Sequence, residues 1–553
     1  MINGKSLIFA IILTLSAITA LNAAENSVRE RNIEDAQRVF GKSAVDSFEQ
    51  MFQSGNFDFK SYGRYKDSVL HYAVFMNNLD RVKLLLKKGA DVNAQNDDGN
   101  TAVFFAALNG NLEMVQYLVE NGADVNAQND DDNTAVFFAA LSGNMELVQY
   151  LIENGADITT KNKTDDTILN FAARSGNLKL VQWLVEKGID VNSKNDSEHL
   201  CLHYAALSGN LELVKWLVEK GLDVNAQNND GCTCLYLAAQ SGNLELVKWL
   251  VEQGLDVNAK SEDDSTPLHA AAQSGNLELV KWLVEQGADI HAKTYRGQTA
   301  LCCAAQSGKL ELVQWLVEQG VEGVKDYDVL YEAVNARNME LIQWLIDQGA
   351  DVSSNYSVLS CAVYYNDMKL AQYLVKHGAN VRKSVSALNQ AALSGNLEML
   401  QWLIAHGADV NNKDSEGRLV LWYAVNSNNM DALHYLVEHE GVDVNSSIYN
   451  NSNFSALEEA VNQNDLETVK YLVEHGAYIN PHQGFKYYRI PGWYNMEHVD
   501  PEIVKYLRER DALLKGLSIA VSLIVLAALM AIVYFVYRII RPKKPVETEL
   551  SSS

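Results

Sequence analysis

The residues with the greatest chemical potential in this sequence are three histidines, His71, His203 and His269, and six cysteines in the middle of the chain. An imidazole can serve as a general base or a metal ligand, and a thiolate as a nucleophile or a zinc ligand. No pattern supports such chemistry, because the sequence has no Ser-His-Asp arrangement, His-Glu-x-x-His motif, Gly-x-Gly-x-x-Gly motif or P-loop. We therefore expect no catalytic set, no metal site and no cofactor, so the protein is not expected to be an enzyme.

Acidic residues form a second recurring group. They gather in short clusters that are about 33 residues apart, or twice that before the last one: Asp97 and Asp98, Asp130 to Asp132, Asp165 and Asp166, Asp196 with Glu198, and Glu262 to Asp264. This spacing would align them as a carboxylate ridge along one edge of a repeating structure. The candidate partner-binding residues of the ridge are Asp98, Asp131, Asp165 and Asp263. Two interpretations are open: Asp and Asn form tight turns and helix caps, or the ridge docks a basic partner or weakly binds divalent cations.

Length and charge limit the classes of protein to consider. Single hydrophobic cores stop growing near about 250–300 residues, so 553 residues indicate several domains or a repeat array. The composition is that of a folded chain, with 48% apolar residues, and the six prolines suit a mostly helical fold. The formal charge of −25 repels phosphate backbones, which disfavours nucleic-acid binding and favours basic partners or cations.

The two ends have the composition of membrane-targeting segments. Residues 1–24 are predicted to be a signal peptide, because a short apolar stretch follows Lys5 and precedes small residues; an uncleaved anchor is the alternative. Residues 517–537 contain no charge and would cover about 31 Å as a transmembrane helix. The basic tail, residues 538–553, favours a cytoplasmic C-terminus. We therefore expect a single-pass membrane protein with its bulk on the non-cytoplasmic side.

Between these ends a unit of 33 residues recurs. Residues 243–254 and 276–287 both read NLELVKWLVEQG, and a glycine closes each unit at a spacing of 33 from Gly89 to Gly320. Self-similarity at such a period is typical of a repeat array in which each unit contacts its neighbours. The elements that must position the histidines and carboxylates are therefore stacked copies of one small unit.

The run TPLHAAAQSGNLELVKWLVEQGADIHAK, residues 266–293, resembles the ankyrin repeat. The resemblance covers residues 67–480, about three quarters of the chain. It implies an all-α fold, an ankyrin-repeat solenoid of stacked helix-turn-helix units with hairpin loops, to which the transmembrane helix is added. The local chemistry agrees, since Thr266 is a good N-cap, Pro267 suits the first helical position, and Gly287 can end the second helix.

The predicted array has about thirteen units and departs from regularity in several places. Three units within residues 321–407 are shortened, because their closing glycines lie 29 residues apart, and we expect the hairpin ridge to be interrupted between 321 and 386. Residues 439–441 carry a one-residue insertion at a helix end. Residues 25–66 are predicted to hold a linker and a degenerate capping repeat, and residues 481–515 a degenerate C-terminal cap.

The resemblance also assigns the histidines, which occupy the fourth position of the TPLH motif and would tie the hairpin loop to the helix by hydrogen bonds. Cys201 and Cys234 hold the same position in adjacent units. Stacked helices lie about 8–10 Å apart, which is too far for a disulfide. We therefore expect the cysteines to be buried or half-buried free thiols.

Family members usually bind partners through the hairpin tips and the concave side of the first helices. The matching concave positions are Leu108, Leu141, Arg174, Leu207, Gln240, Gln273, Gln306 and Leu393, with Tyr364 and Tyr365 in a shortened unit. An aromatic ladder holds one position of the second helices: Tyr117, Tyr150, Trp183, Trp216, Trp249, Trp282, Trp315, Trp344, Tyr373, Trp402, Tyr435, Tyr471 and Tyr506. The ladder either packs neighbouring units together or forms a contact stripe for a partner.

These features predict a membrane-anchored ankyrin-repeat scaffold that mediates protein–protein interactions. Its protein partner is unidentified, the ridge would favour a basic one, and residues 517–537 would contact the lipid bilayer. An alternative is a secreted or delivered effector of an intracellular bacterium that binds host proteins. An enzyme or a channel is disfavoured, because no catalytic set is present and one helix would conduct only as an oligomer.

Overall fold

The computed structural model describes residues 36, 39–40, 42–57, 66–353, 356–442, 444–445, 455–477 and 499–510. These residues belong to two compact units, which divide between Val324 and Lys325. Within the described ranges the secondary structure is helical and no strand is formed, although Gln227 and Thr233 make one isolated antiparallel bridge. Residues 66–477 hold thirteen helix pairs, so the predicted all-α solenoid is confirmed for the repeats.

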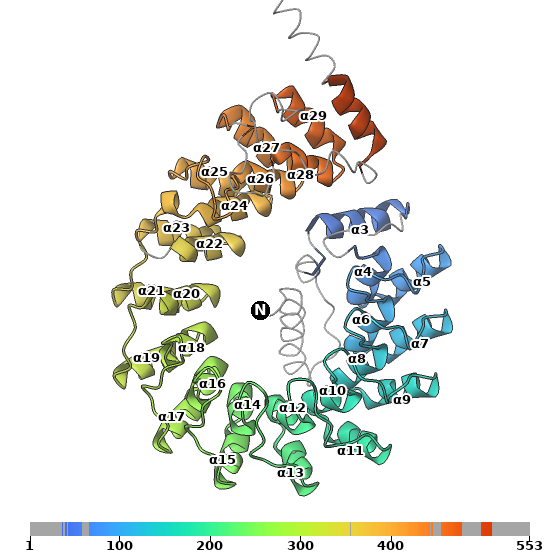
Figure 1. The fold of residues 1–553 in the computed structure, drawn as a ribbon, viewed down its shortest axis with the longest axis vertical. Helices are drawn as coiled ribbons and strands as arrows, with labels where there is room; N and C mark the ends of the chain where they lie inside the picture. The colour runs from blue at the N-terminus through green and yellow to red at the C-terminus, as the bar shows by residue number, and fades with distance from the viewer. Residues whose placement is uncertain are drawn as a thin grey trace, which may run out of the picture. The chain divides into compact units, whose positions relative to one another are not determined.

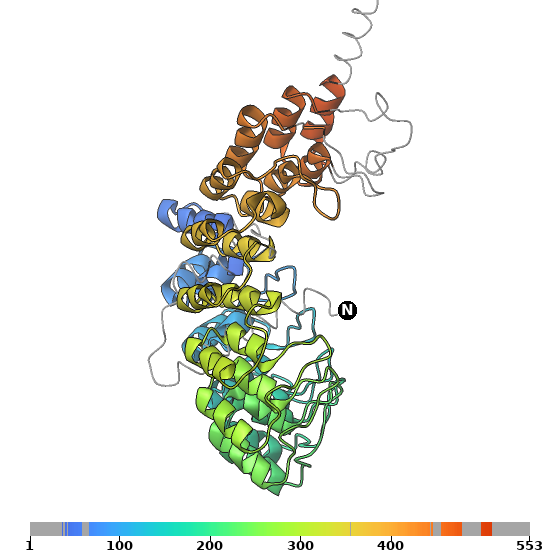
Figure 2. The ribbon, with the colours of Figure 1, turned by 90° about the vertical axis from the view of Figure 1, so that its left-hand side faces the viewer.

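Unit 1 is a curved array of two helix rows. Successive first helices pack against one another and form the inner helix layer, and the second helices lie outside it (Figure 1). The first helices are α4 (Val69–Phe75), α6 (Ala102–Leu108), α8 (Ala135–Leu141), α10 (Ile168–Arg174), α12 (Cys201–Ser208), α14 (Cys234–Ser241), α16 (Pro267–Ser274) and α18 (Ala300–Ser307). The second helices are α5 (Leu79–Lys87), α7 (Leu112–Glu120), α9 (Met145–Glu153), α11 (Leu178–Glu186), α13 (Leu211–Glu219), α15 (Leu244–Glu252), α17 (Leu277–Glu285) and α19 (Leu310–Glu318). The connecting hairpins of this unit gather on one side of the helices (Figure 2).

The repeated sequence explains where the helices begin and end. Asn276 is the N-cap of α17: its Oδ1 accepts the N–H of Leu279 at 3.1 Å, and its Nδ2 donates to the carbonyl of Gly242 in the preceding unit at 2.8 Å. Gly275 ends α16 with φ +75°, a left-handed conformation that costs glycine little. Leu279 and Leu283 are fully buried, so one face of α17 packs on the first helices.

Each histidine bonds the residue before its helix, and His203 also joins its helix to the following hairpin, as the resemblance implies; Nε2 of His71 and of His269 has no hydrogen-bond partner among the described residues. In His71, His203 and His269, Nδ1 accepts the backbone N–H of the residue three positions earlier at 3.0–3.2 Å. Nε2 of His203 also lies 3.1 Å from the carbonyl oxygen of Ala226 in the following hairpin. Burial lowers the pKa of His71 and of His203 to about 4, so both rings are neutral at neutral pH and act as hydrogen-bonding supports. The six cysteines are free thiols, four buried and two half-buried, as predicted.

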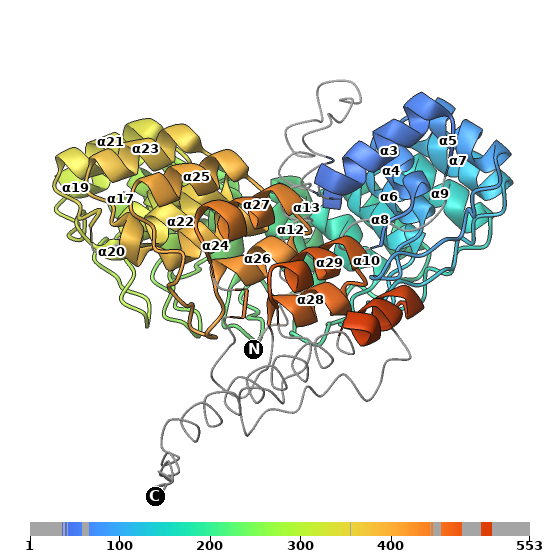
Figure 3. The same cartoon turned by 90° about the horizontal axis from the view of Figure 1, so that it is seen from above.

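Unit 2 contains the shortened repeats. Its first and second helices again form two rows (Figure 3). The first helices are α20 (Tyr327–Asn335), α22 (Tyr356–Tyr364), α24 (Val385–Leu393), α26 (Val420–Asn426) and α28 (Ala456–Asn462). The second helices are α21 (Met339–Asp347), α23 (Met368–Lys376), α25 (Leu397–Ala405), α27 (Met430–His434) and α29 (Leu466–Glu474). A 3-10 turn, η1 (Val381–Lys383), stands between α23 and α24 where other units carry a hairpin tip.

The one-residue insertion before Gly441 is absorbed inside the helix. α27 continues directly into a π-helical turn, η2 (Tyr435–His439), in which the N–H of Glu440 donates to the carbonyl of Tyr435 at 3.3 Å. A π-turn holds one residue more per hydrogen-bonded ring than an α-turn. The extra residue therefore widens one turn and leaves Leu436, which is fully buried, facing the core.

Each end of the described array carries an additional helix. α3 (Lys42–Ser54) ends at Gly55, with φ +69°, and covers α4. Both oxygens of Glu49 on α3 accept hydrogen bonds from Arg81 on α5, at 2.5 and 3.0 Å. At the other end, the helix formed by residues 501–510 buries Ile503 and Leu507 completely. Both helices protect an otherwise open end of the stacked core.

The predicted signal peptide (1–24) and transmembrane helix (517–537) lie outside the described residues, as do residues 478–498 and 511–553. No helix in the part of the chain that the structure describes is both long and apolar enough to cross a bilayer.

Candidate functional site

The ten residues predicted for the concave side fall into two sets. Seven lie at or just beside the ends of consecutive first helices in unit 1, from α6 to α18: Leu108, Leu141, Arg174, Leu207, Gln240, Gln273 and Gln306. Because these helices pack in order, the structure brings the seven together as one row, which we call the inner row. The other three, Tyr364, Tyr365 and Leu393, lie on or next to α22 and α24 of unit 2 and form a separate set.

The inner row changes character along unit 1. Leu108, Leu141 and Leu207 are half-buried, whereas the glutamines of α14, α16 and α18 are exposed. Nε2 of Gln273 donates to Oε1 of Gln306 at 3.1 Å, which aligns two successive positions. These side chains contribute little to the buried core, so they are available to a partner.

A second row, which was not predicted from the sequence, lies beside the first. It consists of aromatic residues three positions before the inner row: Phe105, Phe138, Phe171 and Tyr204. The ring of Phe138 lies 5.6 Å from that of Phe104, and the ring of Phe171 lies 5.1 Å from that of Phe137, so each unit orders the next. The signal was present, because residues three apart share a helix face and these four recur every 33 residues.

A polar cluster interrupts this apolar surface at α10 and α12. Oδ1 of Asp166 accepts hydrogen bonds from the Tyr204 hydroxyl at 3.0 Å and from Nδ2 of Asn195 at 2.9 Å. Its Oδ2 accepts the hydroxyl of Thr164 at 3.1 Å. Arg174 lies close enough for electrostatic interaction with Asp166 and Tyr204, but among the described residues its side chain forms no hydrogen bond or ion pair. The cluster combines a satisfied carboxylate with an unpaired guanidinium.

The hairpin tips of unit 1 are joined by a ladder of backbone hydrogen bonds. In each step an N–H near one tip donates to a carbonyl of the preceding tip at 2.8–3.0 Å: Asp130 to Asp98, Lys163 to Asp131, Asp196 to Thr164, Asn229 to Ser197, Glu262 to Asp230, and Tyr295 to Asp263. Seven hairpins thus form one continuous edge. No equivalent bond occurs among the described residues of 321–386, where the tips are absent.

The predicted ridge carboxylates lie on this edge, and two of the four, Asp165 and Asp263, form contacts that stabilise the turns. Asp165 adopts φ +61° at its tip and pairs with Lys161 at 3.1 Å. Asp263 accepts the hydroxyl of Ser261 at 2.6 Å. Asp98 is half-buried and Asp131 is exposed. Within the described residues, no three His, Cys, Asp or Glu side chains gather closely enough to hold a metal ion. The edge is acidic and ordered, and the turn-forming interpretation explains much of its composition.

Below the tips runs a buried ladder of side-chain amides. Nδ2 of Asn96 donates to Oδ1 of Asp67 at 2.9 Å, and Nδ2 of Asn129 donates in the same way to Asn100 at 2.9 Å. Asp67 is 2% exposed and is the only acid at the first two rungs. Burial raises the pKa of Asp67 to about 6. The sequence pattern did not reveal this ladder, because its partners come from different units.

The family follows from comparison with known proteins. Ten overlapping segments, which together run from residue 41 to residue 483, match the family described as "Ankyrin repeats (3 copies)". The chain belongs to the ankyrin-repeat family. The "Notch-regulated ankyrin repeat-containing protein B" of Danio rerio is 36% identical over 77 residues, which are 14% of this chain and 69% of that protein. The "Notch-regulated ankyrin repeat-containing protein" of Xenopus tropicalis is 38% identical over 74 residues, 13% of this chain and 65% of that protein.

Ankyrin repeats imply protein partners in general, and the segments matched by these relatives cover only about two repeats. The human protein of the same name shows the same extent, with 36% identity over 74 residues and 65% of its length covered. Such short matches establish the repeat and not the activity or partners of a whole protein. The specific surface must therefore be read from this chain's own residues.

The outer aromatic ladder of the ankyrin array has a structural explanation. All thirteen of its residues are half-buried. Lys187 places Nζ 5.3 Å from the ring centroid of Trp183, and in unit 2 the ring of His406 lies 4.4 Å from that of Trp402. No two ladder rings contact each other within the described ranges. Some rings contact a Lys or His of their own helix, and others contact one of the preceding unit, as Trp315 does with Lys281 at 5.9 Å and Tyr471 with His434 at 4.4 Å. The ladder therefore joins neighbouring units through these cations and imidazoles and not through contacts between its own rings.

Two of the three residues of the separate set in unit 2 are aromatic. The side chain of Tyr364 is 64% exposed, and its ring meets that of Tyr365 edge-on at 5.2 Å. The hydroxyl of Tyr365 donates to Oδ1 of Asn335 at 2.6 Å, which fixes the pair. An exposed tyrosine held in this way can supply rigid contact area to a partner.

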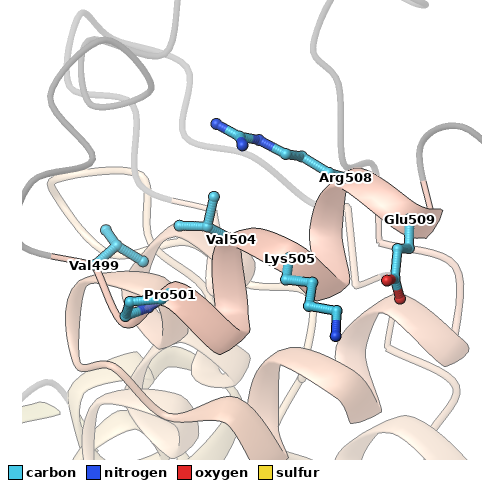
Figure 4. Close-up of a pocket in the computed structure, with 6 residues that line it drawn as sticks. All are labelled: Val499, Pro501, Val504, Lys505, Arg508 and Glu509. Atoms are coloured by element: carbon cyan, nitrogen blue, oxygen red, sulfur yellow. The ribbon is translucent and has the colours of Figure 1, made fainter.

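A hollow of about 470 Å³ lies on the helix of residues 501–510. Its described lining residues extend from this one helix and from Val499, two residues before it: Val499, Pro501, Val504, Lys505, Arg508 and Glu509 (Figure 4). Walls that come from one helix, as they do among the described residues, cannot enclose a small molecule. The geometry therefore does not support a substrate pocket there.

Proposed function

We propose that this chain is a membrane-anchored scaffold whose ankyrin repeats bind protein partners and which has no catalytic activity of its own. The observation that carries protein binding is the inner row. Seven side chains lie in order on helices that pack consecutively, and they are not needed to fill the core. Flat, extended surfaces of mixed apolar and amide side chains suit a polypeptide partner better than a small molecule.

Support for the membrane anchor comes from the sequence. Residues 517–537 carry no charge, are long enough to cross a bilayer as a helix, and are followed by Arg538, Arg541, Lys543 and Lys544. With residues 1–24 as a signal peptide, the repeats would lie on the non-cytoplasmic side. Protease protection of an epitope at residues 548–553 in sealed membrane vesicles tests this topology. Digestion of that epitope from the non-cytoplasmic side would contradict the proposed orientation.

A matched pair of variants tests protein binding. The inner-row variant changes the exposed Gln240, Gln273 and Gln306 to Arg. The control changes three exposed glutamines of the second helices in the same units to Arg: Gln253, Gln286 and Gln319. Proximity labelling with the full-length chain, followed by quantitative mass spectrometry, should identify neighbours that the inner-row variant loses and the control keeps. Equal labelling by all three proteins would show that the inner row binds no partner.

The chemistry of the hairpin edge favours a basic partner for that surface. Asp130 and Asp131 are exposed and no Lys pairs with either carboxylate among the described ion pairs. An acidic edge attracts basic segments over distances near the Debye length, about 8 Å in physiological salt. Changing both residues to Asn should slow association with a basic partner and reduce its salt dependence. An unchanged association rate would remove the ridge from the proposal.

A further inference from the structure

Arg174 differs from every other half-buried arginine that the structure describes. The other three, Arg81, Arg418 and Arg510, each have a carboxylate oxygen within 2.5–3.6 Å of a guanidinium nitrogen. Arg174 is half-buried as well, yet no carboxylate of the described residues reaches it within ion-pair distance. A guanidinium carries five N–H donors in a fixed fork. The side chains and carbonyls of the described residues leave this donor set of Arg174 unused.

The nearest acid cannot fill this role. Both carboxylate oxygens of Asp166 are already engaged, one by the Tyr204 hydroxyl and Asn195, and the other by Thr164. Turning Asp166 toward Arg174 would break three hydrogen bonds in a half-buried cluster, and each such loss is costly. Asp166 therefore supplies a favourable field to Arg174 without satisfying its donors.

Burial at this position is energetically unfavourable for a guanidinium charge without a nearby counter-charge. Burial lowers the pKa of the Arg174 guanidinium, and the fields of Tyr204 and Asp166 offset only part of that effect. A partly desolvated charge gains most from a partner of opposite charge that also accepts its hydrogen bonds. Arginine and carboxylate can form two parallel N–H···O bonds, so an external carboxylate would compensate the burial.

The surroundings of Arg174 define what such a carboxylate must bring with it. Leu141 on α8 and Leu207 on α12 occupy the same helix position in the two neighbouring units and are half-buried. Phe171 precedes Arg174 by three residues on α10, so it lies on the same face. Neighbouring helices are about 8–10 Å apart, which sets the spacing between the charge and the apolar contacts.

We propose that Arg174 binds the carboxylate of an Asp or Glu in a partner polypeptide whose apolar side chains contact Leu141 and Leu207. This inference rests on the proposed protein-binding function and names the chemistry of one partner segment. In an extended segment, with about 3.3 Å per residue, the apolar residues stand about two or three positions from the acid. In a helix, with about 1.5 Å per residue, they stand about five to seven positions away.

A peptide-display selection against the purified full-length chain tests this. The probe is a random library of 16-residue peptides, selected on the wild type and on Arg174→Glu, with Lys179→Glu as control. Lys179 is exposed on α11 of the same unit, and the equivalent positions in other units hold Glu113, Glu146, Glu212 and Glu245, so the control makes the same charge change without disturbing the helix. Circular dichroism before selection confirms that all three proteins are folded.

We expect peptides selected on the wild type and on Lys179→Glu to share one acidic position flanked by apolar residues. Selection on Arg174→Glu should place Lys or Arg at that position. Individual wild-type peptides should lose affinity on the order of ten-fold or more on Arg174→Ala. Peptides without a shared acid, or with the same acid after selection on Arg174→Glu, would overturn the inference while leaving protein binding intact. If no peptide bound any of the proteins, the proposed function would fail with it.

Discussion

Asp67 is a buried carboxylate at a position where the next unit carries an amide. Its Oδ1 accepts Nδ2 of Asn96, and Asn100 makes the equivalent contact with Asn129 one unit later. Asn100 is 5% exposed, which shows that an amide fits at this rung. Asp67→Asn should therefore keep the hydrogen bond and remove a buried charge. We expect the variant to be more stable than the wild type at neutral and alkaline pH.

The magnitude follows from the pKa of Asp67, which burial raises from 3.8 to about 6. The folded state binds this proton more tightly than the unfolded state, so the carboxyl stabilises the fold fully below pH 3.8. That stability is lost as the pH rises through 6. At about 1.4 kcal/mol per pH unit, the cost of the ionised group at pH 8 is about 3 kcal/mol. Asp67→Asn should recover about this amount at pH 8, about half of it near pH 5, and little below pH 4.

Hydrogen exchange measured by mass spectrometry is a suitable assay, because end units of a solenoid can open separately from the rest. The free energy of opening is compared for α4 amides of the two proteins at pH 8 and pH 5, each corrected for the intrinsic exchange rate. Titration of His71, whose pKa burial lowers to about 4, is common to both proteins and cancels. As a control, Asn100→Asp should destabilise at pH 8 and less so at pH 5. A stability gain from Asp67→Asn that is the same at both pH values, or a loss at pH 8, would refute the reasoning.

Three further changes have defined expectations. Lys309 is the N-cap of α19 without a side-chain cap, so Lys309→Asn should add about 1 kcal/mol in a urea titration, and no gain would show that the cap geometry differs from its neighbours. Glu49→Gln should weaken the packing of α3 by about 1.5 kcal/mol, because it removes the charged acceptor of the Arg81 hydrogen bonds. That hydrogen bond lowers the pKa of Glu49, so its stabilising effect in the wild type should be lost as the pH falls through the lowered pKa. The control Glu212→Gln, in an exposed ion pair, should change stability little. Deletion of Glu440 should convert η2 into a regular α-helical turn with slower amide exchange and an unchanged or higher Tm; faster exchange would contradict it.

Much of the fold could be predicted from the period. Gly275 and its equivalents had to sit where the chain reverses, because a left-handed backbone excludes most side chains. The apolar pattern of NLELVKWLVEQG placed Leu279 and Leu283 in the core, where both are fully buried. The insertion at 439–441 could be seen in the sequence as an extra residue. That the helix accommodates it by a π-turn could not be predicted, because the sequence does not specify which turn widens.

The candidate site was predicted only by position. The spacing correctly placed the inner row of unit 1 on consecutive helices, since equivalent residues in stacked units must align. It did not predict that Tyr364, Tyr365 and Leu393 belong to a second compact unit, because a change in repeat length does not specify where one unit ends and the next begins. It also could not tell that Asp166 accepts three hydrogen bonds from its neighbours while Arg174 has no partner among the residues that the structure describes. Such differences depend on which hydrogen-bond acceptors of neighbouring units are already occupied, and a repeat pattern does not show this.

The regularity of the array gives single departures a clear meaning. Leu141 and Leu207 share the backbone setting of Arg174, so a leucine is compatible with this helix end on both sides of it. Local folding therefore does not require a cation there, and burial makes the cation unfavourable. Asp67 is a departure of the same kind, a charge where Asn100 shows that an amide suffices, but its oxygen is already bound within the ladder. The two differ in that the donors of Arg174 have no acceptor among the described residues, and it is on this difference that the proposal of Arg174 as a binding residue rests.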